Sequence, residues 1–133
     1  MIKDIVVGTK IYARIIHPGY TPKGVSFLTP ADNPLQVGVF LHPSGYEIKP
    51  HTHKESLKII NVIQEVLHIE YGCVEVCFYE NDGLIVAKEM LYEGDTIILL
   101  SGGHGFRIVK DAKIIEIKQG PYQGNEMDKV YFS

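Results

Sequence analysis

Short runs of β-branched and aromatic residues recur along the chain, and they constrain its fold more than any other feature. The expected strands are Ile11–Ile16, Val25–Leu28, Leu35–Leu41, Tyr46–His53, Ile59–Tyr71, Val74–Tyr79, Leu84–Glu89, Thr96–Leu100, Phe106–Val109 and Ile114–Lys118. The expected turns between the later strands are Tyr71-Gly72, Asn81-Asp82-Gly83, Glu93-Gly94-Asp95 and Lys110-Asp111, with Asp82-Gly83 the clearest hairpin. Strands at spacings of about 8–12 residues are typical of a sandwich or barrel, so we expect an all-β fold.

One segment, Lys54–Gln64, also fits a helix, because Leu57, Ile60 and Ile63 would line one side of it. We favour a long strand there, since β-branched residues dominate. The strand Ile59–Ile69 would carry apolar side chains on both faces, which implies burial on both sides. A second subunit could provide that cover, so we expect a homodimer.

The bulk properties fit one globular domain over residues 1–133, with 45% hydrophobic and 22% charged residues. A net charge of -3 gives no basic patch for nucleic acid, so the expected partner is a small molecule. No apolar run is long enough to span a membrane, and the N-terminus MIKDIVVGTKIYAR lacks the features of a signal peptide. Cys73 and Cys77 would lie too far apart on one strand to bond, so we expect reduced thiols and a cytoplasmic protein.

His51 and His53 are the residues that most suggest chemistry. On a strand, residues two apart point to the same side, so the two imidazoles would lie about 6–7 Å apart and face one point. Such a pair is half of a metal site, and Glu65 and His104 are the best candidates for the other half. Glu55 is an alternative to Glu65 as the carboxylate ligand, because Glu55 is two residues after His53 and would point to the same face of a strand.

Glu65 shares its face with Leu67 and Ile69, which places a carboxylate at the start of an apolar row. A buried carboxylate is costly unless it is paired or binds a cation. His104 lies between glycines and shares its face with Phe106 and Ile108, which we expect to point inward. Both residues are therefore expected at an interior site.

The spacing Gly45-x5-His51-x-His53, followed by Glu65-x6-Gly72, resembles the first motif of the cupin superfamily. In that family the two histidines and the glutamate of this motif bind a metal inside a β-barrel.

The segment GDTIILLSGGHGF, from Gly94 to Phe106, resembles the second cupin motif, which supplies a further histidine. The resemblance implies a cupin-like double-stranded β-helix, or jelly-roll barrel. It also implies one divalent transition metal (Fe, Mn, Zn, Ni or Co) bound by His51, His53, Glu65 and His104.

The segments GGHGF and EIKQGPYQG also resemble small uncharacterised cupins linked to cell-surface polysaccharide synthesis. The resemblance implies a metal-dependent enzyme, an isomerase, epimerase or oxygenase, acting on a small sugar-like or carboxylate-bearing molecule. Two alternatives remain open: a non-catalytic ligand-binding or sensor cupin, and a metal-independent sugar-nucleotide epimerase or isomerase. The sequence indicates no catalytic residue outside the metal site.

Several other polar residues lie near the expected site or carry imidazoles. Those that could reach the pocket or its rim are Tyr46, Glu47, Lys49, Lys118 and Gln119. We expect His17 and His42 to be exposed to solvent and His68 to point away from the barrel interior. The C-terminal residues Tyr122, Val130, Tyr131 and Phe132 are expected to pack back on the domain.

Overall fold

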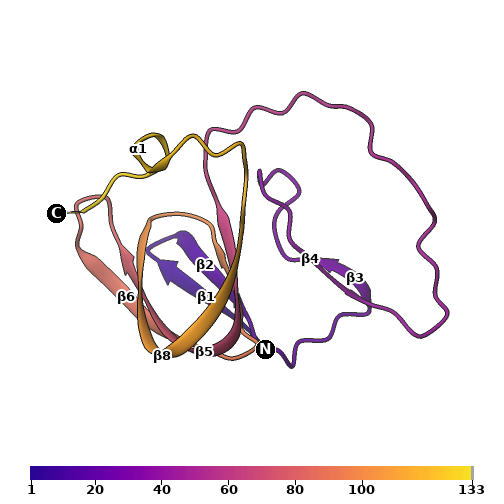
Figure 1. Ribbon diagram of the computed structural model, residues 1–133, viewed down its shortest axis with the longest axis horizontal. Helices are drawn as coiled ribbons and strands as arrows, with labels where there is room; N and C mark the ends of the chain where they lie inside the picture. The colour runs from indigo at the N-terminus through magenta and orange to yellow at the C-terminus, as the bar shows by residue number, and fades with distance from the viewer. Residues whose placement is uncertain (133) are drawn as a thin grey trace. The chain divides into compact units, whose positions relative to one another are not determined.

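The computed structural model describes residues 1–132 and is nearly all-β, as expected. The described chain forms two compact units, one of residues 1–20 and 64–132 and one of residues 21–63, and each is described by itself. The strands are β1 (Ile2–Val7), β2 (Lys10–Ile16), β3 (Gly24–Phe27), β4 (Gly38–Leu41), β5 (Glu65–Tyr79), β6 (Ile85–Tyr92), β7 (Thr96–Leu99) and β8 (Gly103–Lys118). A single short helix, α1 (Asn125–Asp128), occurs among the described residues (Figure 1).

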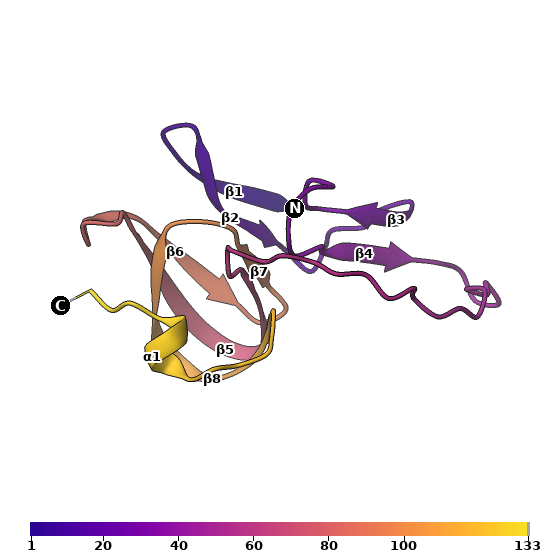
Figure 2. The same cartoon turned by 90° about the horizontal axis from the view of Figure 1, so that it is seen from above.

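The first unit is an antiparallel sheet that curls into half a barrel, in the strand order β1-β2-β7-β5-β6 with β8 on the other side of β5. The long strand β5 organises it. Its first residues, Glu65–His68, pair with β7, and its last, Cys73–Tyr79, pair with β6. Strand β8 follows β5 along almost its whole length, so β5 and β8 form one long curved ribbon (Figure 2).

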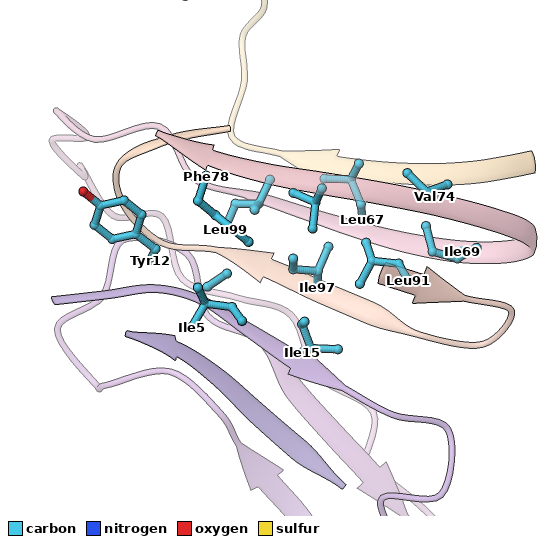
Figure 3. Packing of buried hydrophobic residues seen from close by; sticks show 12 residues of the cluster. Ile5, Tyr12, Ile15, Leu67, Ile69, Val74, Phe78, Leu91, Ile97 and Leu99 are labelled. Carbon is cyan, nitrogen blue, oxygen red and sulfur yellow. The ribbon is translucent and has the colours of Figure 1, made fainter. Parts of the chain in front are cut away.

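The core of this unit lies on the inner side of the curl. Its buried members are Ile5, Tyr12, Ala13, Ile15, Leu67, Ile69, Val74, Val76, Phe78, Leu91, Ile97 and Leu99. Figure 3 shows these side chains gathered between the β1–β2 hairpin and β5. Alternate residues of β5 supply the core, as the pleat of a strand requires, and each large apolar side chain contributes about 1.5–3 kcal/mol by burial.

Two expected turns are interruptions within strands instead. Strand β5 continues through Gly72 and β8 continues through Lys110-Asp111, while the register between them shifts at several points from Ile69 to Val74. Bulges of this kind bend a strand without ending its pairing. The expected hairpin at Asp82-Gly83 is confirmed between β5 and β6, with Gly83 at φ 86°.

The expected strand Tyr46–His53 is wrong, and so is the first part of the expected strand Ile59–Tyr71, because the chain is irregular from residue 42 to residue 64. A strand needs a partner for its ladder, and Pro50 offers no N–H donor in the middle of the first run. Lys54–Gln64 is not helical either. Conversely, β1 was not expected; it is an edge strand that pairs with β2 through a turn at Gly8.

The second unit contains the antiparallel β3–β4 hairpin. Its aromatic rings follow one another: Phe27 contacts Phe40, Phe40 contacts His42, and His42 stacks on Tyr46 at 3.9 Å. No helix among residues 1–132 is long and apolar enough to cross a membrane.

Candidate functional site

Glu65 and His104 meet inside the curled sheet of the first unit. Glu65 Oε2 lies 3.4 Å from His104 Nε2, and their side chains are 13% and 29% exposed. In the β5–β8 ladder Glu65 is opposite Lys118 and His104 is opposite Phe78, so the two belong to opposite ends of the ribbon. Their contact shows that the curl brings these ends together. Glu65 and His104, two of the four expected ligands, are therefore in contact.

The bend of the ribbon has a local cause at Gly72. Its φ of +96° is in the region that favours glycine, and a Cβ built there would lie 2.6 Å from the Cα of Ala112. The backbones of β5 and β8 therefore approach each other at a point where only glycine fits. The register shifts around Gly72 add to the bend.

Glu65 is held as a carboxylate. Its pKa is lowered, first by the polar contact with His104 and further by the charges of His104 and Lys118, although burial raises it. A contact with Glu116 acts in the lowering direction as well. An ionised carboxylate beside an imidazole is a combination that either binds a cation or orients the ring for proton transfer.

Lys118 joins this site through its own ion pair. Its Nζ lies 3.0 Å from Asp128 Oδ2 of α1 and 5.2 Å from the centre of the Tyr122 ring. The pKa of Lys118 is raised, first by the hydrogen bond to Asp128, with smaller contributions from the charges of Glu116 and Glu65. Lys118 is one of the residues expected to reach the pocket or its rim, but nothing in the sequence indicates Asp128 as its partner.

Gln119, the next residue, is tied to the start of β5. Its Oε1 accepts a hydrogen bond from the backbone N–H of Gln64 at 2.9 Å. Its buried Nε2 has no hydrogen-bond partner among the described residues. The side-chain amide nitrogen of Gln119 is therefore a buried donor at this end of the ribbon that no described residue uses.

His51 and His53 lie in the second unit, on the irregular segment and not on a strand. Their ring centres are nevertheless 5.2 Å apart, close to the separation expected from the strand argument. The Nδ1 of His51 donates to the carbonyl of Lys49 at 2.7 Å, which leaves Nε2 with a free lone pair. The competing Glu55 is exposed on the same irregular segment.

The structure thus contains two pairs of the four expected ligands, one pair in each unit. Over residues 1–132 no group of three or more His, Cys, Asp or Glu side chains gathers in a way suited to a metal. Both cysteines, Cys73 and Cys77, are free and lie on β5.

The remaining histidines have structural partners. His68 alternates with the core residues of β5, as expected, and its Nδ1 bonds the Thr96 hydroxyl at 2.8 Å. His17 was expected to be simply exposed, but its Nδ1 contacts the buried Asp95 at 2.8 Å. No local pattern indicated that pairing, because the two residues are far apart along the chain. Ile108 was expected to point inward but is 51% exposed, since β8 is an edge strand there.

No known protein family, curated protein or solved structure matches the chain. The class of protein that the structure defines is an all-β protein with a curled antiparallel sheet and an internal Glu65–His104 pair. The resemblance to cupins stays a prediction from the motifs.

Proposed function

We propose that this protein is a metal-binding enzyme of the cupin type, with one divalent transition metal bound by His51, His53, Glu65 and His104. The Glu65–His104 contact carries the proposal. Two donor atoms that are each about 2.0–2.1 Å from one tetrahedral ion lie roughly 3.4 Å apart. The observed distance between Glu65 Oε2 and His104 Nε2 is 3.4 Å. These two atoms are therefore already spaced as ligands of one ion.

The other pair has a matching geometry. Two imidazoles that bind one tetrahedral ion have ring centres about 5 Å apart, given a metal–nitrogen distance of about 2.0–2.1 Å. The ring centres of His51 and His53 are 5.2 Å apart. The bond from His51 Nδ1 to a backbone carbonyl is the kind of support that orients a metal-binding imidazole.

The chemistry would belong to the metal and to the acid–base groups around it. A bound divalent ion could polarise a substrate oxygen or activate water. Lys118 lowers the pKa of Glu65 through its charge and Glu116 lowers it through a hydrogen bond, so both would favour the ionised carboxylate at the site. The proposed substrate is a small sugar-like or carboxylate-bearing molecule, in the context of cell-surface polysaccharide metabolism.

Several finer features belong to the same proposal. The curled sheet of the first unit would be part of a jelly-roll barrel, and both units together would make one cupin domain. The protein would act as a homodimer, since the 16-residue edge strand β8 pairs only with β5 among the described strands. Its free cysteines suit the reducing cytoplasm.

A second candidate is a metal-independent epimerase or isomerase of sugar nucleotides. The same contact supports it, because an ionised Glu65 beside His104 would orient the ring and stabilise its charged form as His104 accepts a proton. A non-catalytic ligand-binding or sensor protein is a third reading of an internal polar pair.

Elemental analysis of protein purified without added metal tests the proposal. We expect about one equivalent of a transition metal in the wild type, and its loss in His51→Ala, Glu65→Gln and His104→Ala. His42→Ala is the matched control, because His42 is an imidazole of the second unit that stacks on Tyr46 instead of on another histidine. Circular dichroism would show whether each variant keeps its β-structure.

The proposal would be contradicted if the wild-type protein carried no metal and took up none of Fe, Mn, Zn, Ni or Co on dialysis. If a panel of sugar nucleotides then revealed turnover that survives a chelator and depends on His104, the metal-independent enzyme would be favoured. Specific binding without turnover would favour the sensor.

A further inference from the structure

One segment of the second unit exposes apolar side chains without belonging to a strand. Leu57 and Ile59 are 95% and 90% exposed. No backbone hydrogen bond joins residues 54–63 to another backbone group among residues 1–132. We call residues 57–61 the LKIIN segment, after their sequence. An extended apolar segment with an unpaired backbone is able to add as a strand to the edge of a sheet.

Strand β8 has one edge that no other described strand pairs with, because its only partner is β5. The backbone N–H and C=O groups along such an edge are a template for a further strand. Ile115 and Ile117 of β8 are 45% and 57% exposed. They stand opposite His68 and Val66 in the β5–β8 ladder, so they lie on the face away from the core. This edge therefore offers both backbone partners and apolar surface.

The LKIIN segment and β8 complement each other in one antiparallel register, in which Ile59 stands opposite Ile115. Two residues along, Leu57 then stands opposite Ile117. Because residues two apart on a strand share a face, these four apolar side chains would lie together on the outer face of the sheet. The pairing would cover the most exposed side chains of both partners.

The inner face of the sheet fits the same register. Ile60 would stand opposite Ile114, which packs against the buried core. Lys58 would stand opposite Glu116, and opposite charges at facing positions stabilise an antiparallel pair. A shift of two residues would place Lys58 opposite Lys118 or Ile114 instead, so the charges select this register.

The segment that adds to β8 must come from a second copy, because a chain's own segment does not reach this register. Asn61 would stand opposite Lys113, which is 118 − 113 = 5 residues along β8 from Lys118. Lys118 is opposite Glu65, the first residue of β5. Five residues of strand and two strand spacings put Asn61 about 19 Å from Glu65. The four residues from Asn61 to Glu65 span at most about 14 Å.

We propose that the LKIIN segment of one copy adds to the free edge of β8 in a second copy, antiparallel and with Ile59 opposite Ile115. In a homodimer each copy donates one segment and accepts one. This exchange rests on the homodimer of the proposed function and assigns the residues that join the two copies. It requires no metal.

Light scattering at micromolar concentrations is the first test. We expect the wild type to have twice the 14.9 kDa mass of the chain. Ile59→Asp should weaken the dimer by about tenfold or more, because it removes an apolar pair and places a carboxylate against Ile115. Val130→Asp is the matched control, with no change expected, because Val130 is 93% exposed but lies outside the LKIIN segment.

A disulfide between two different variants tests the register. Ile59→Cys protein and Ile115→Cys protein, each with Cys73→Ala and Cys77→Ala, are mixed, left to exchange subunits and oxidised mildly. Each chain then has a single thiol, so a bond within one chain is impossible. Directly opposite residues of antiparallel strands have Cα atoms about 4.5–5.5 Å apart, which suits a disulfide. We expect this heterodimer to form at least about tenfold faster than one between Ile59→Cys and Ile85→Cys, because Ile85 is similarly exposed, at 48%, but lies on β6.

A dimer that tolerates Ile59→Asp, or a disulfide no faster at Ile115 than at Ile85, would overturn the exchange and leave the proposed homodimer in place. A monomeric wild type would overturn both. A rapid bond within a monomer that carries both Ile59→Cys and Ile115→Cys would also overturn the exchange, because the chain's own segment would then cover β8. Light scattering uses the native cysteines, so that test stands even if the cysteine-free background does not fold. Neither measurement depends on metal, so the metal analysis succeeds or fails separately.

Discussion

Gly72→Ala tests the bend of the β5–β8 ribbon most directly. Gly72 has φ +96°, and a methyl group there would meet the backbone of Asp111 and Ala112, with 2.6 Å to the Cα of Ala112. The unfavourable backbone conformation costs an alanine about 1–2 kcal/mol. Overpacking against backbone atoms adds about 1–3 kcal/mol. We therefore expect Gly72→Ala to lower the free energy of unfolding by roughly 2–5 kcal/mol.

Gly83→Ala is the matched control for that prediction. Gly83 has nearly the same φ, +86°, but its nearest heavy atom to an added Cβ is 3.5 Å away, an ordinary contact. Only the backbone cost of about 1–2 kcal/mol applies there. Urea unfolding followed by circular dichroism measures both variants against the wild type. The difference between them isolates the steric part of the cost at Gly72.

The reasoning would be refuted if Gly72→Ala were no more destabilising than Gly83→Ala. That result would mean that β5 and β8 do not approach closely at the bend. A folded Gly72→Ala protein should also show faster modification of the His104 imidazole by diethyl pyrocarbonate, because a relaxed bend moves the two ends of the ribbon apart. Unchanged access to His104 despite a large loss of stability would separate the bend from the site.

Three further predictions concern the core and two carboxylates. Phe78→Ala, at a fully buried position, should lower the free energy of unfolding by about 3–5 kcal/mol in thermal or urea unfolding. Leu84→Ala, at a position that is 61% exposed, should lower it by only about 0.5 kcal/mol. Similar losses in the two variants would disprove the assigned core. Arg14 lowers the pKa of Asp4 from 3.8 by hydrogen bonding, so Asp4→Asn should cost about 0.5–1 kcal/mol at neutral pH. That cost should be lost as the pH falls from 3.8 through the lowered pKa of folded Asp4, and a pH-independent cost would contradict it. Asp95→Ala should lower the free energy of unfolding by about 1–3 kcal/mol in urea, because the buried carboxylate of Asp95 accepts a backbone hydrogen bond in the β6–β7 turn. An unchanged free energy of unfolding would contradict that role.

The strands that local pattern predicted well are those whose partners lie nearby or whose residues alternate clearly. β2, β6 and β7 fall close to the expected ranges, as does β3. The segment from Tyr46 to Ile63 contains β-branched and aromatic residues as well, but it forms no ladder. Composition describes what a strand can bury, but a ladder also needs a partner, and no local pattern supplies one.

The site shows the same division between local and non-local information. Parity and glycine spacing were enough to select Glu65 and His104, because each lies on the inner face of its own strand. The distance between them depends on the curl of the whole β5–β8 ribbon. The sequence did not predict this ribbon, because Gly72 and Lys110-Asp111 were expected to be turns that end the strands. The partner of Lys118 was equally hidden, since Asp128 belongs to a turn-rich segment with no strand pattern.

The six-residue spacing between Glu65 and Gly72 acquires a physical meaning from this bend. Glu65 lies 72 − 65 = 7 residues before Gly72, and Phe78, which is opposite His104, lies 78 − 72 = 6 residues after it. The bend therefore divides the ribbon into two arms of nearly equal length, and their ends meet where Glu65 contacts His104. A one-residue change in either arm would also turn its side chains to the other face of the sheet. The spacing thus sets both the distance and the direction of the carboxylate, which is why a motif confined to one strand can predict a contact made across the curled sheet.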